Sequence, residues 1–410
     1  MAKFFFPLVL LLILHSAIPS LQKMSPVDLA ALSAIKDSLI DIKHNNFFST
    51  WDFTAPDPCS SFSGIACSSL NRVISLTLGT GLSGSPGLAG SLSPSIANLT
   101  ELTQLILFSG LVTGPIPPQI GQLKNLRVIS LTKNRLTGPI PTTFSSLPNL
   151  HTLDLSFNEL TGSISPGLTG LTQLKVLILA SNRLSGDLPD VVSTELLHLD
   201  LKINKLTGKL PLSLPSTIRY LSLSENTMWG QINGLQSLSE LVFLDLSMNQ
   251  FSGPIPPSLF DPRLSLMFLQ RNNLSGGVPP RTSDPTASYG EGSIVDLSHN
   301  FLTGELSGVL AGVETLFLNN NRLMGTIPQD YIDSVYSGTT KTLYLQHNYM
   351  SRFPLKPGRE LPDTASICLV YNCMVPPVGL TTCPASAGDQ LSRPAPQCSG
   401  VFEILNSSIP

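Results

Sequence analysis

Residues 126–141 read LRVISLTKNRLTGPIP, and residues 241–256 read LVFLDLSMNQFSGPIP. Both stretches follow one pattern, L-x-x-L-x-L-x-x-N-x-L-x-G-x-I-P, in which aliphatic or aromatic residues share the L positions. The asparagine of this pattern recurs ten times, at Asn134, Asn158, Asn182, Asn204, Asn226, Asn249, Asn272, Asn300, Asn321 and Asn348. Gly110 takes its place in an earlier copy, and an irregular first copy begins near Val73. This register predicts about twelve stacked coils between residues 73 and 354.

Each position of the repeat has a physical role. The alternating x-L-x-L-x segment predicts a short strand with its leucines on one face. One coil cannot bury those leucines alone, so neighbouring coils must stack into a continuous core. A buried asparagine after the strand can bond main-chain groups that the turn leaves unpaired, each of which would cost about 1–3 kcal/mol. The Gly and Pro are expected to form a turn before the convex segment. The fold class predicted is an α/β solenoid with a parallel sheet on its concave face.

Both ends of such a stack need caps, because a terminal coil would expose its leucines. Residues 21–72 are expected to form the N-terminal cap. Ser25-Pro-Val-Asp28 is typical of a helix start with Ser25 as N-cap, and leucines at near-helical spacing follow. Residues 355–410 are rich in Cys and Pro and are expected to form the C-terminal cap and tail.

The six cysteines lie outside the repeats, and an even number in an exported chain is typical of disulfides. Cys59 and Cys67 precede the repeats and are expected to pair. The other four allow three pairings, among which the sequence does not choose: Cys368, Cys373, Cys383 and Cys398. No Cys or His spacing resembles a zinc site, so neither a metal ion nor another cofactor is expected.

Residues 1–20 have the pattern of a secretory signal peptide. Lys3 precedes an apolar run at residues 4–14, which is too short for a bilayer span of about 20 residues. No later stretch approaches such a length, so a secreted protein without membrane insertion is expected. Three N-glycosylation sequons fit this compartment: Asn98, Asn273 and Asn406. A formal net charge of −3 does not favour a nucleic-acid partner.

Four features together resemble the plant extracellular leucine-rich-repeat proteins. They are the D-x-x-A-L-x-x-x-K helix from Asp28 to Lys36, the C-x7-C loop ending at Cys67, turns such as residues 136–141, and the cysteine-bearing C-terminal cap. The resemblance implies a right-handed leucine-rich-repeat superhelix with disulfide-bearing caps. Relatives include receptor-like proteins, receptor kinases and polygalacturonase inhibitors. The chain departs from the inhibitors in having two cysteines before the repeats where they usually have four, and Phe62 stands where this loop often has Trp.

The concave face carries the candidate binding surface. The column four residues before each repeat asparagine mostly holds small polar residues or Asp, but three aromatic residues occur there within a few coils. Two more aromatics lie in a nearby column, and an arginine lies beside them. The candidate binding residues are Tyr220, Phe243, Phe268, Arg271, Phe317 and Tyr344. Exposed aromatics with an arginine are typical of binding hot spots, although such rings can also simply pack against one another along a sheet.

Aspartates in the same column do not favour catalysis. Asp154, Asp200, Asp245 and Asp296 belong to the repeat pattern, and no two of them fall on consecutive coils. This separation weakens the case for paired-acid chemistry. Neither an H-E-x-x-H nor a G-x-S-x-G motif accompanies the histidines. No catalytic residue is therefore expected, and the protein is not expected to be an enzyme.

The sequence thus predicts a secreted recognition protein of the apoplast or cell wall, acting in signalling or defence. Its expected partners are an extracellular protein or peptide, a cell-wall glycan, or the ectodomain of a membrane receptor. The alternative is a proteinaceous inhibitor of a cell-wall-degrading hydrolase such as polygalacturonase.

Overall fold

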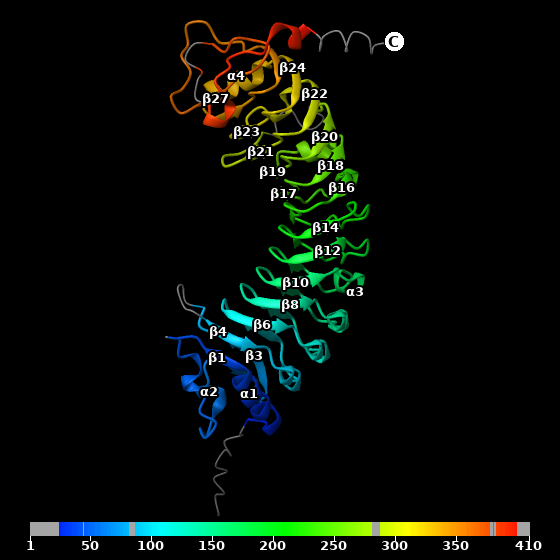
Figure 1. Cartoon of the computed structure of the whole chain (residues 1–410), viewed down its shortest axis with the longest axis vertical. Coiled ribbons are helices and arrows are strands. Elements are labelled where there is room, and N and C mark those ends of the chain that lie inside the picture. The colour runs from blue at the N-terminus through cyan, green and yellow to red at the C-terminus, as the bar shows by residue number, and fades with distance from the viewer. Residues whose placement is uncertain are drawn as a thin grey trace, which may run out of the picture.

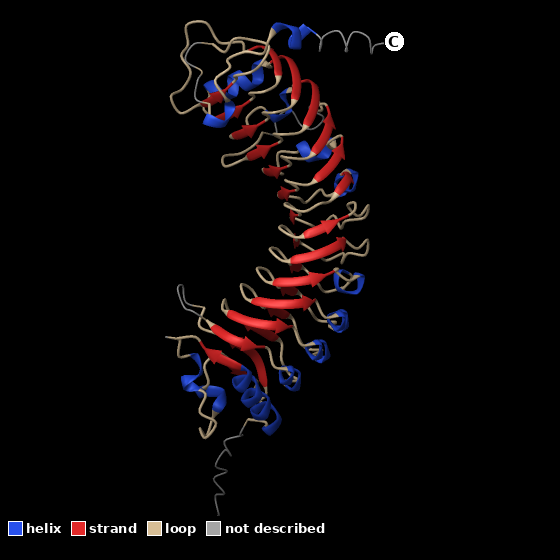
Figure 2. Ribbon diagram, in the orientation of Figure 1, coloured by secondary structure: helices blue, strands red, loops and turns tan. Residues whose placement is uncertain are grey.

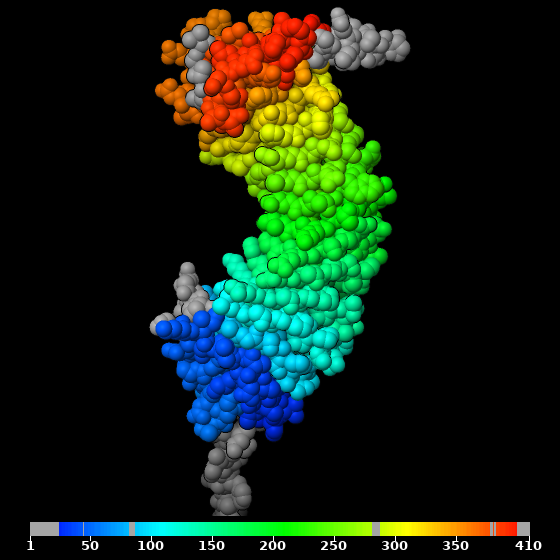
Figure 3. Space-filling model, viewed as in Figure 1, coloured from blue at the N-terminus to red at the C-terminus, as the bar shows by residue number. Residues whose placement is uncertain are grey.

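The computed structural model describes residues 24–43, 45–81, 87–280, 288–377, 380 and 383–399. These residues wind into stacked coils that form an arc, with the N-terminal cap at one end and the C-terminal cap at the other (Figure 1). The space-filling view shows the open inner side of the same arc (Figure 3). The predicted solenoid is confirmed. The expected signal peptide and the sequon at Asn406 lie outside the described residues.

A sheet of fourteen strands follows the concave side of the arc (Figure 2). Its strands are parallel, except that the first pair is antiparallel. In sheet order they are β2 (Ile65–Cys67), β3 (Val73–Leu78), β5 (Gln104–Leu107), β7 (Val128–Ser130), β9 (Thr152–Asp154), β11 (Val176–Ile178), β13 (His198–Asp200), β15 (Tyr220–Ser222), β17 (Phe243–Asp245), β19 (Leu266–Phe268), β21 (Ile294–Asp296), β23 (Thr315–Phe317), β25 (Thr342–Tyr344) and β27 (Ser366–Cys368).

Two flank sheets run beside the concave sheet, on the segment where the sequence predicted only a Gly-Pro turn. The first has seven strands: β1 (Leu39–Asp41), β4 (Leu88–Ser91), β6 (Leu111–Pro115), β8 (Arg135–Pro139), β10 (Glu159–Gly162), β12 (Arg183–Asp187) and β14 (Lys205–Thr207). The second has six: β16 (Trp229–Gln231), β18 (Gln250–Gly253), β20 (Asn273–Gly276), β22 (Phe301–Glu305), β24 (Arg322–Thr326) and β26 (Tyr349–Arg352). The L-x-G segment of the repeat is therefore a second strand.

Short helices complete the coils, and several of them lie along the convex side (Figure 2). The labelled α-helices are α1 (Pro26–Ser38), α2 (Pro58–Ser61), α3 (Pro166–Thr169) and α4 (Gln329–Tyr336), and residues 395–399 are also helical. The 3-10 helices are η1 (Phe47–Thr50), η2 (Pro94–Asn98), η3 (Pro118–Gln122), η4 (Thr142–Ser146), η5 (Asn233–Ser237), η6 (Pro257–Phe260), η7 (Gly308–Leu310) and η8 (Ala385–Ala387). Many begin with proline, whose fixed φ suits a helix start. Among the described helices none is long and apolar enough to cross a membrane.

The repeat leucines form one continuous core. In the coil quoted first, Leu126, Ile129, Leu131 and Leu136 are all completely buried. Equivalent side chains belong to a single cluster that extends from the N-terminal cap to Leu380. Because each coil contributes only a few of these side chains, the stacking of neighbours is what removes them from water.

The repeat asparagines form a ladder of hydrogen bonds between coils. In a representative rung, Asn249 Oδ1 accepts the N–H of Met228 at 3.0 Å, and its Nδ2 donates to the carbonyls of Leu223 and Leu246 at 2.9 and 3.2 Å. The preceding residue, Met248, has a left-handed φ of 55°. Eleven asparagines make the same Oδ1 contact, namely Asn134, Asn158, Asn182, Asn204, Asn226, Asn249, Asn272, Asn300, Asn321, Asn348 and Asn372.

The ladder begins and ends in ways that the sequence only partly indicates. Asn372 adds a rung beyond residue 354, where the predicted coils stop, and β27 pairs with β25 in the same register. Because cysteines surround Asn372, the sequence placed this coil in the expected C-terminal cap and not among the repeats. At the other end, Gly110 replaces an asparagine because a Cβ there would lie 2.5 Å from the carbonyl oxygen of Leu88.

A buried ion pair joins the N-terminal cap to the first coil. Asp28 on α1 is completely buried, and its carboxylate accepts two hydrogen bonds from Arg72 at 3.0 Å and the N–H of Val73 at 2.9 Å. Ser25 precedes the helix as expected, but its side chain makes no capping hydrogen bond. Phe62, which stands where relatives often have Trp, stacks on the buried ring of Trp51 at 5.2 Å.

Three disulfides hold the caps. Cys59 pairs with Cys67, as expected. The C-terminal pairs are Cys368–Cys383 and Cys373–Cys398, one of the three arrangements that the sequence allowed. The guanidinium of Arg393 lies 4.1 and 4.5 Å from the ring centroids of Tyr349 and Tyr371, so the tail also packs on the last coils through cation–π contacts.

Replacing one ladder residue tests the role of the amide. We expect Asn249→Ala to lower the free energy of unfolding by about 1–3 kcal/mol, because it leaves the buried Met228 N–H without a partner. The carbonyls of Leu223 and Leu246 lose one donor each but keep the amides of Asn226 and Asn272. Urea unfolding followed by circular dichroism measures the change. The control is Gln250→Ala at the adjacent exposed position. Equal effects of the two substitutions would refute the role of the ladder.

The cap ion pair gives a second prediction. Asp28→Asn keeps the shape of the side chain but removes the charge that faces Arg72, so we expect a loss of about 2–3 kcal/mol in stability. Asp37→Asn, on the exposed side of the same helix, should change stability little. Hydrogen exchange should show the loss first in the amides of α1. Unchanged exchange there would contradict the prediction.

Candidate binding face

The first and third residues of each three-residue strand of the concave sheet lie on its concave side, and most of them are partly exposed, although Asp200 and Ser222 are buried. In β17 the buried Leu244 separates Phe243 and Asp245, which are both partly exposed. The sheet register aligns Phe243 with Tyr220 on one side and with Leu266 on the other. Side chains of the same repeat position therefore form columns along the inside of the arc.

Four of these side chains form a continuous stack, here named the aromatic ladder: His198, Tyr220, Phe243 and Phe268. The rings of His198 and Tyr220 are parallel with centroids 4.0 Å apart, and the next pair is 4.2 Å apart. Phe243 and Phe268 follow at 5.9 Å in a tilted arrangement. The structure thus brings together three residues of the predicted site. It adds His198, which sequence reasoning could have found because it occupies the same column as Tyr220.

The remaining aromatics of the predicted site form a second group. Phe317 and Tyr344 lie edge to face at 5.2 Å, and the Tyr344 hydroxyl is 3.2 Å from the Ser366 hydroxyl. The coil that carries Asp296 separates them from the aromatic ladder, since Asp296 pairs with Phe268 on one side and Phe317 on the other. All rings in both groups keep part of their surface exposed.

Arg271 lies at the edge of the face rather than within a strand. It follows β19, has a left-handed φ of 58°, and is exposed. It lines a shallow hollow together with His299, Asn273 and Phe301, and this hollow opens toward the second flank sheet. The lining does not include Phe268, beside which the sequence placed Arg271.

The aromatic ladder is uncharged at neutral pH. Burial raises the pKa of Tyr220 to about 12, and the nearby carboxylates of Asp200 and Asp245 act in the same direction. Burial lowers the pKa of His198 below its ordinary value, although Asp200 and Asp154 oppose this effect. The stack therefore presents neutral rings to whatever occupies the concave side.

The aspartates of the neighbouring column accept hydrogen bonds from the residues that follow their strands. Asp245 Oδ1 accepts the N–H and the hydroxyl of Ser247 at 3.0 and 2.7 Å, and Asp154 makes the same pair of bonds to Ser156. Burial raises the pKa of Asp296. These bonds support the structural interpretation of the aspartates. Within the described ranges, no group of three His, Cys, Asp or Glu side chains could hold a metal ion.

A row of basic side chains, here named the basic edge, lies at the opposite margin of the concave sheet. Arg127, His151, Lys175 and Arg219 each directly precede a strand, and the first three lie on consecutive coils. Arg219 lies 3.9 Å from Glu240. In the described part of the chain, neither Arg127 nor Lys175 forms an ion pair. Sequence reasoning missed this row, which recurs seven residues before the repeat asparagine.

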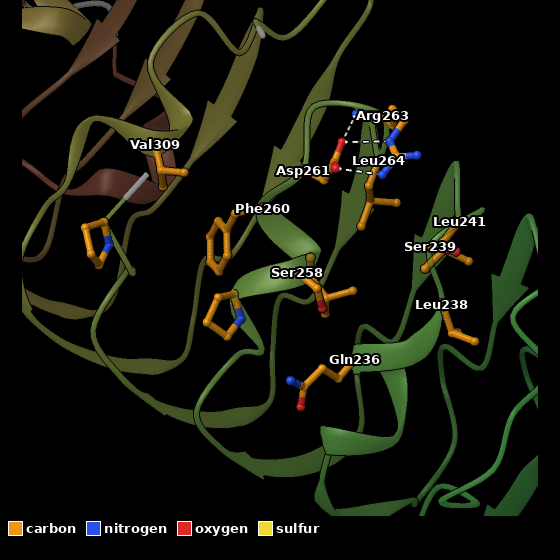
Figure 4. A pocket seen from close by; sticks show the side chains of 13 residues that line it. Gln236, Leu238, Ser239, Leu241, Ser258, Phe260, Asp261, Arg263, Leu264 and Val309 are labelled. Atoms are coloured by element: carbon orange, nitrogen blue, oxygen red, sulfur yellow. Dashed lines mark hydrogen bonds and ion pairs between the residues drawn. The ribbon is translucent and has the colours of Figure 1, made fainter. Parts of the chain in front are cut away.

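A further hollow of about 150 Å³ lies away from the concave face, between η5 and η6 (Figure 4). Its apolar lining includes Leu238, Phe260 and Leu264. At its rim Asp261 and Arg263 form a hydrogen-bonded ion pair at 2.9 Å. The sequence did not predict this hollow.

Sequence models of known families match three parts of the chain. Residues 25–68 match the leucine rich repeat N-terminal domain, and residues 124–184 and 240–261 match leucine rich repeats. These matches fall on the cap around Asp28 and on coils of the asparagine ladder.

Solved structures with the same fold include plant proteins. A chain of the crystal structure of PEPR1-AtPEP1 is 27% identical with a TM-score of 0.65, and the match covers 85% of this chain and 52% of that chain. A plant ice-binding protein is 29% identical with a TM-score of 0.54, covering 75% of this chain and 90% of that one. The plant peptide hormone receptor RGFR1 in complex with RGF2 is 26% identical with a TM-score of 0.51, covering 70% and 54%.

The chain spans about half the length of the first and third of these proteins. The likeness in fold covers 85% and 70% of this chain, including its stacked coils and parallel sheet. The chain therefore contains a leucine rich repeat N-terminal domain and leucine rich repeats, and its fold is similar to that of these plant proteins.

Proposed function

We propose that this protein is secreted to the apoplast or cell wall and that its concave face binds an extended peptide segment in signalling or defence. The segment would be a free peptide or part of an extracellular protein such as a receptor ectodomain. The observation that carries the proposal is the aromatic ladder. A structural neighbour described as a peptide hormone receptor supports it by analogy of fold.

The shape of the ladder suits an extended chain. Its rings follow the arc at the spacing of parallel strands, about 4.8 Å per coil. In an extended peptide the side chains on one face recur about every 6.6 Å, which is wider than the ring spacing, so two or three apolar side chains can lie along the four rings. Neutral, half-exposed aromatic rings are the groups from which binding hot spots are commonly built.

The basic edge adds a preference for charge. Arg127 and Lys175 are exposed and lie on the coils that lead to His198 at the start of the ladder. A ligand that continues from the rings toward the N-terminal coils would meet these cations. The proposed ligand therefore combines apolar side chains for the ladder with acidic side chains for the basic edge.

A binding test does not require the natural ligand. A displayed library of random peptides is selected on the full chain, and the dissociation constant of an enriched peptide is measured by calorimetry. The double substitution Phe243→Ser and Phe268→Ser should weaken binding by about 30-fold, because it removes two central rings. Trp229→Ser is the control, since that ring is 46% exposed on the flank.

Equal binding by the double variant and the control would reject the ladder as the binding site. The alternative, inhibition of a wall-degrading hydrolase, has its own readout. Inhibition of polygalacturonase by the wild-type chain that is lost in the double variant would assign the same face to an enzyme partner. Selection of oligosaccharides instead of peptides on the ladder would identify a glycan-binding protein.

The histidine of the aromatic ladder also predicts how peptide binding depends on pH. Burial already lowers the pKa of His198 in the free protein. A ligand that covers this ring removes more water from it and lowers its pKa further. The protonated ring is therefore less favourable in the complex than in the free protein, so affinity should fall as the pH drops below the pKa of free His198 and stay constant above it. Titrations with an enriched peptide that lacks Asp, Glu and His at pH 7.5 and 5.0 measure this.

Two variants separate His198 from other titrating groups. His198→Gln should make the affinity independent of pH over this range. His151→Gln, on the basic edge and outside the aromatic ladder, should keep the dependence of the wild-type chain. Loss of the dependence in His151→Gln, or its persistence in His198→Gln, would contradict the prediction.

A further inference from the structure

The hollow beside Arg271 contains a glycosylation sequon. Asn273 begins β20, is exposed, and is followed by Leu274 and Ser275, so its side chain has the acceptor sequence N-x-S. The neighbouring strand β22 begins with Phe301. Phe301 pairs with Ser275, which makes it the diagonal neighbour of Asn273 across the flank sheet.

Phe301 is an unusual side chain for this surface. It is 42% exposed, and it stands in a row whose neighbours on adjacent coils are polar, Asn273 and Arg322. The guanidinium of Arg322 lies 4.9 Å from its ring centroid. This cation–π contact supports the ring on one side. The ring and Asn273 line the same hollow.

The other walls of the hollow are polar groups able to bond hydroxyl and amide groups. Arg271 is exposed, and His299 lies 3.3 Å from the amide nitrogen of Asn320. Burial and the charge of Arg271 lower the pKa of His299, so its ring is neutral at neutral pH. An apolar ring beside several donors and acceptors is a combination that suits a pyranose, whose C–H face is apolar and whose rim is polar.

We infer that Asn273 carries an N-linked glycan whose first N-acetylhexosamine lies in this hollow against Phe301. Its polar groups would meet Arg271 and His299. The inference rests on the proposed secretion, because the modification occurs in the secretory pathway. In the linking step, Asn273 Nδ2 loses a proton and bonds to the anomeric carbon of an oligosaccharide, which leaves its polyprenyl diphosphate carrier.

A glycan here changes the role of one predicted binding residue. It would cover Arg271 and the margin of the concave sheet where the strands end. The opposite margin, with the basic edge, would stay open. Arg271 then contacts the glycan of its own chain, and a ligand reaches the aromatic ladder from the side of Arg127 and Lys175.

The chain provides an internal control at Asn98. That sequon is exposed at the end of η2, which packs between α1 and η3, far along the chain from the hollow. A glycan at Asn98 would share the same linkage but not the ring of Phe301. A difference between the two sites in the rate of glycan release is therefore due to the hollow and not to the glycan itself.

The test uses the full chain exported from cultured plant cells. Peptide mapping after release in heavy-oxygen water gives the occupancy of each sequon. Release by peptide-N-glycosidase from the native protein should be about fivefold slower at Asn273 than at Asn98, because stacking shields the linkage. Phe301→Leu, which stays apolar but loses the flat ring, should remove this difference and leave Asn98 unchanged.

Two results would overturn the inference. One is an exported protein with Asn98 glycosylated and Asn273 bare. The other is a glycan at Asn273 whose release rate is the same in the wild-type and Phe301→Leu chains. Either result leaves the proposed peptide binding intact, because binding to the aromatic ladder is measured separately. Failure of export, in contrast, would overturn the proposed secretion together with this inference.

Discussion

The whole architecture depends on one hydrogen-bonded amide per coil. Each ladder asparagine bonds both its own coil and the preceding one, as Asn249 does with Leu246 and Leu223. It follows a residue with left-handed φ, a conformation that non-glycine residues adopt reluctantly. The amide compensates for this turn because it satisfies main-chain groups that the turn leaves buried. Leucine burial supplies the driving force for stacking, but the amide fixes where each coil turns.

The same constraint leaves the concave face free to vary. Positions that form the asparagine ladder or fill the leucine core admit few residue types, whereas most of the outer positions of the concave strands are partly exposed and do neither. Along β13, β15 and β17 the first of these positions holds His198, Tyr220 and Phe243. The flank residue Arg271 and the basic edge occupy other unconstrained positions. The side chains that differ chemically from coil to coil are therefore confined to a few columns of an otherwise uniform scaffold.

How well the sequence predicts each part of the fold depends on whether that part belongs to the constrained repeat positions or to the variable ones. The coils, the leucine core and ten rungs of the ladder were predictable because they recur in register. The flank sheets were not, since a segment with one leucine and a Gly-Pro pair has the composition of a turn. Asn372 was not predicted as a rung because its coil lies among cysteines, and the pairing of Cys368 with Cys383 is seen only in the structure. The six residues predicted to bind a ligand are all partly exposed or exposed. Their division into two groups and the position of Arg271 at the edge depend on register and turn geometry, which the sequence does not show.

Packing among the rings and binding by the rings are compatible. A lone Phe243 on an open strand would rotate among rotamers, and a ligand would have to order it at a cost of about 0.5–1.5 kcal/mol. In the stack, Tyr220 at 4.2 Å and Phe268 at 5.9 Å already restrict that motion. Their contacts cover the ring faces along the arc axis and leave the edges that point into the concave space. Mutual stacking thus prepares the ladder for a ligand, because the entropy of ordering the rings is lost on folding and not on binding.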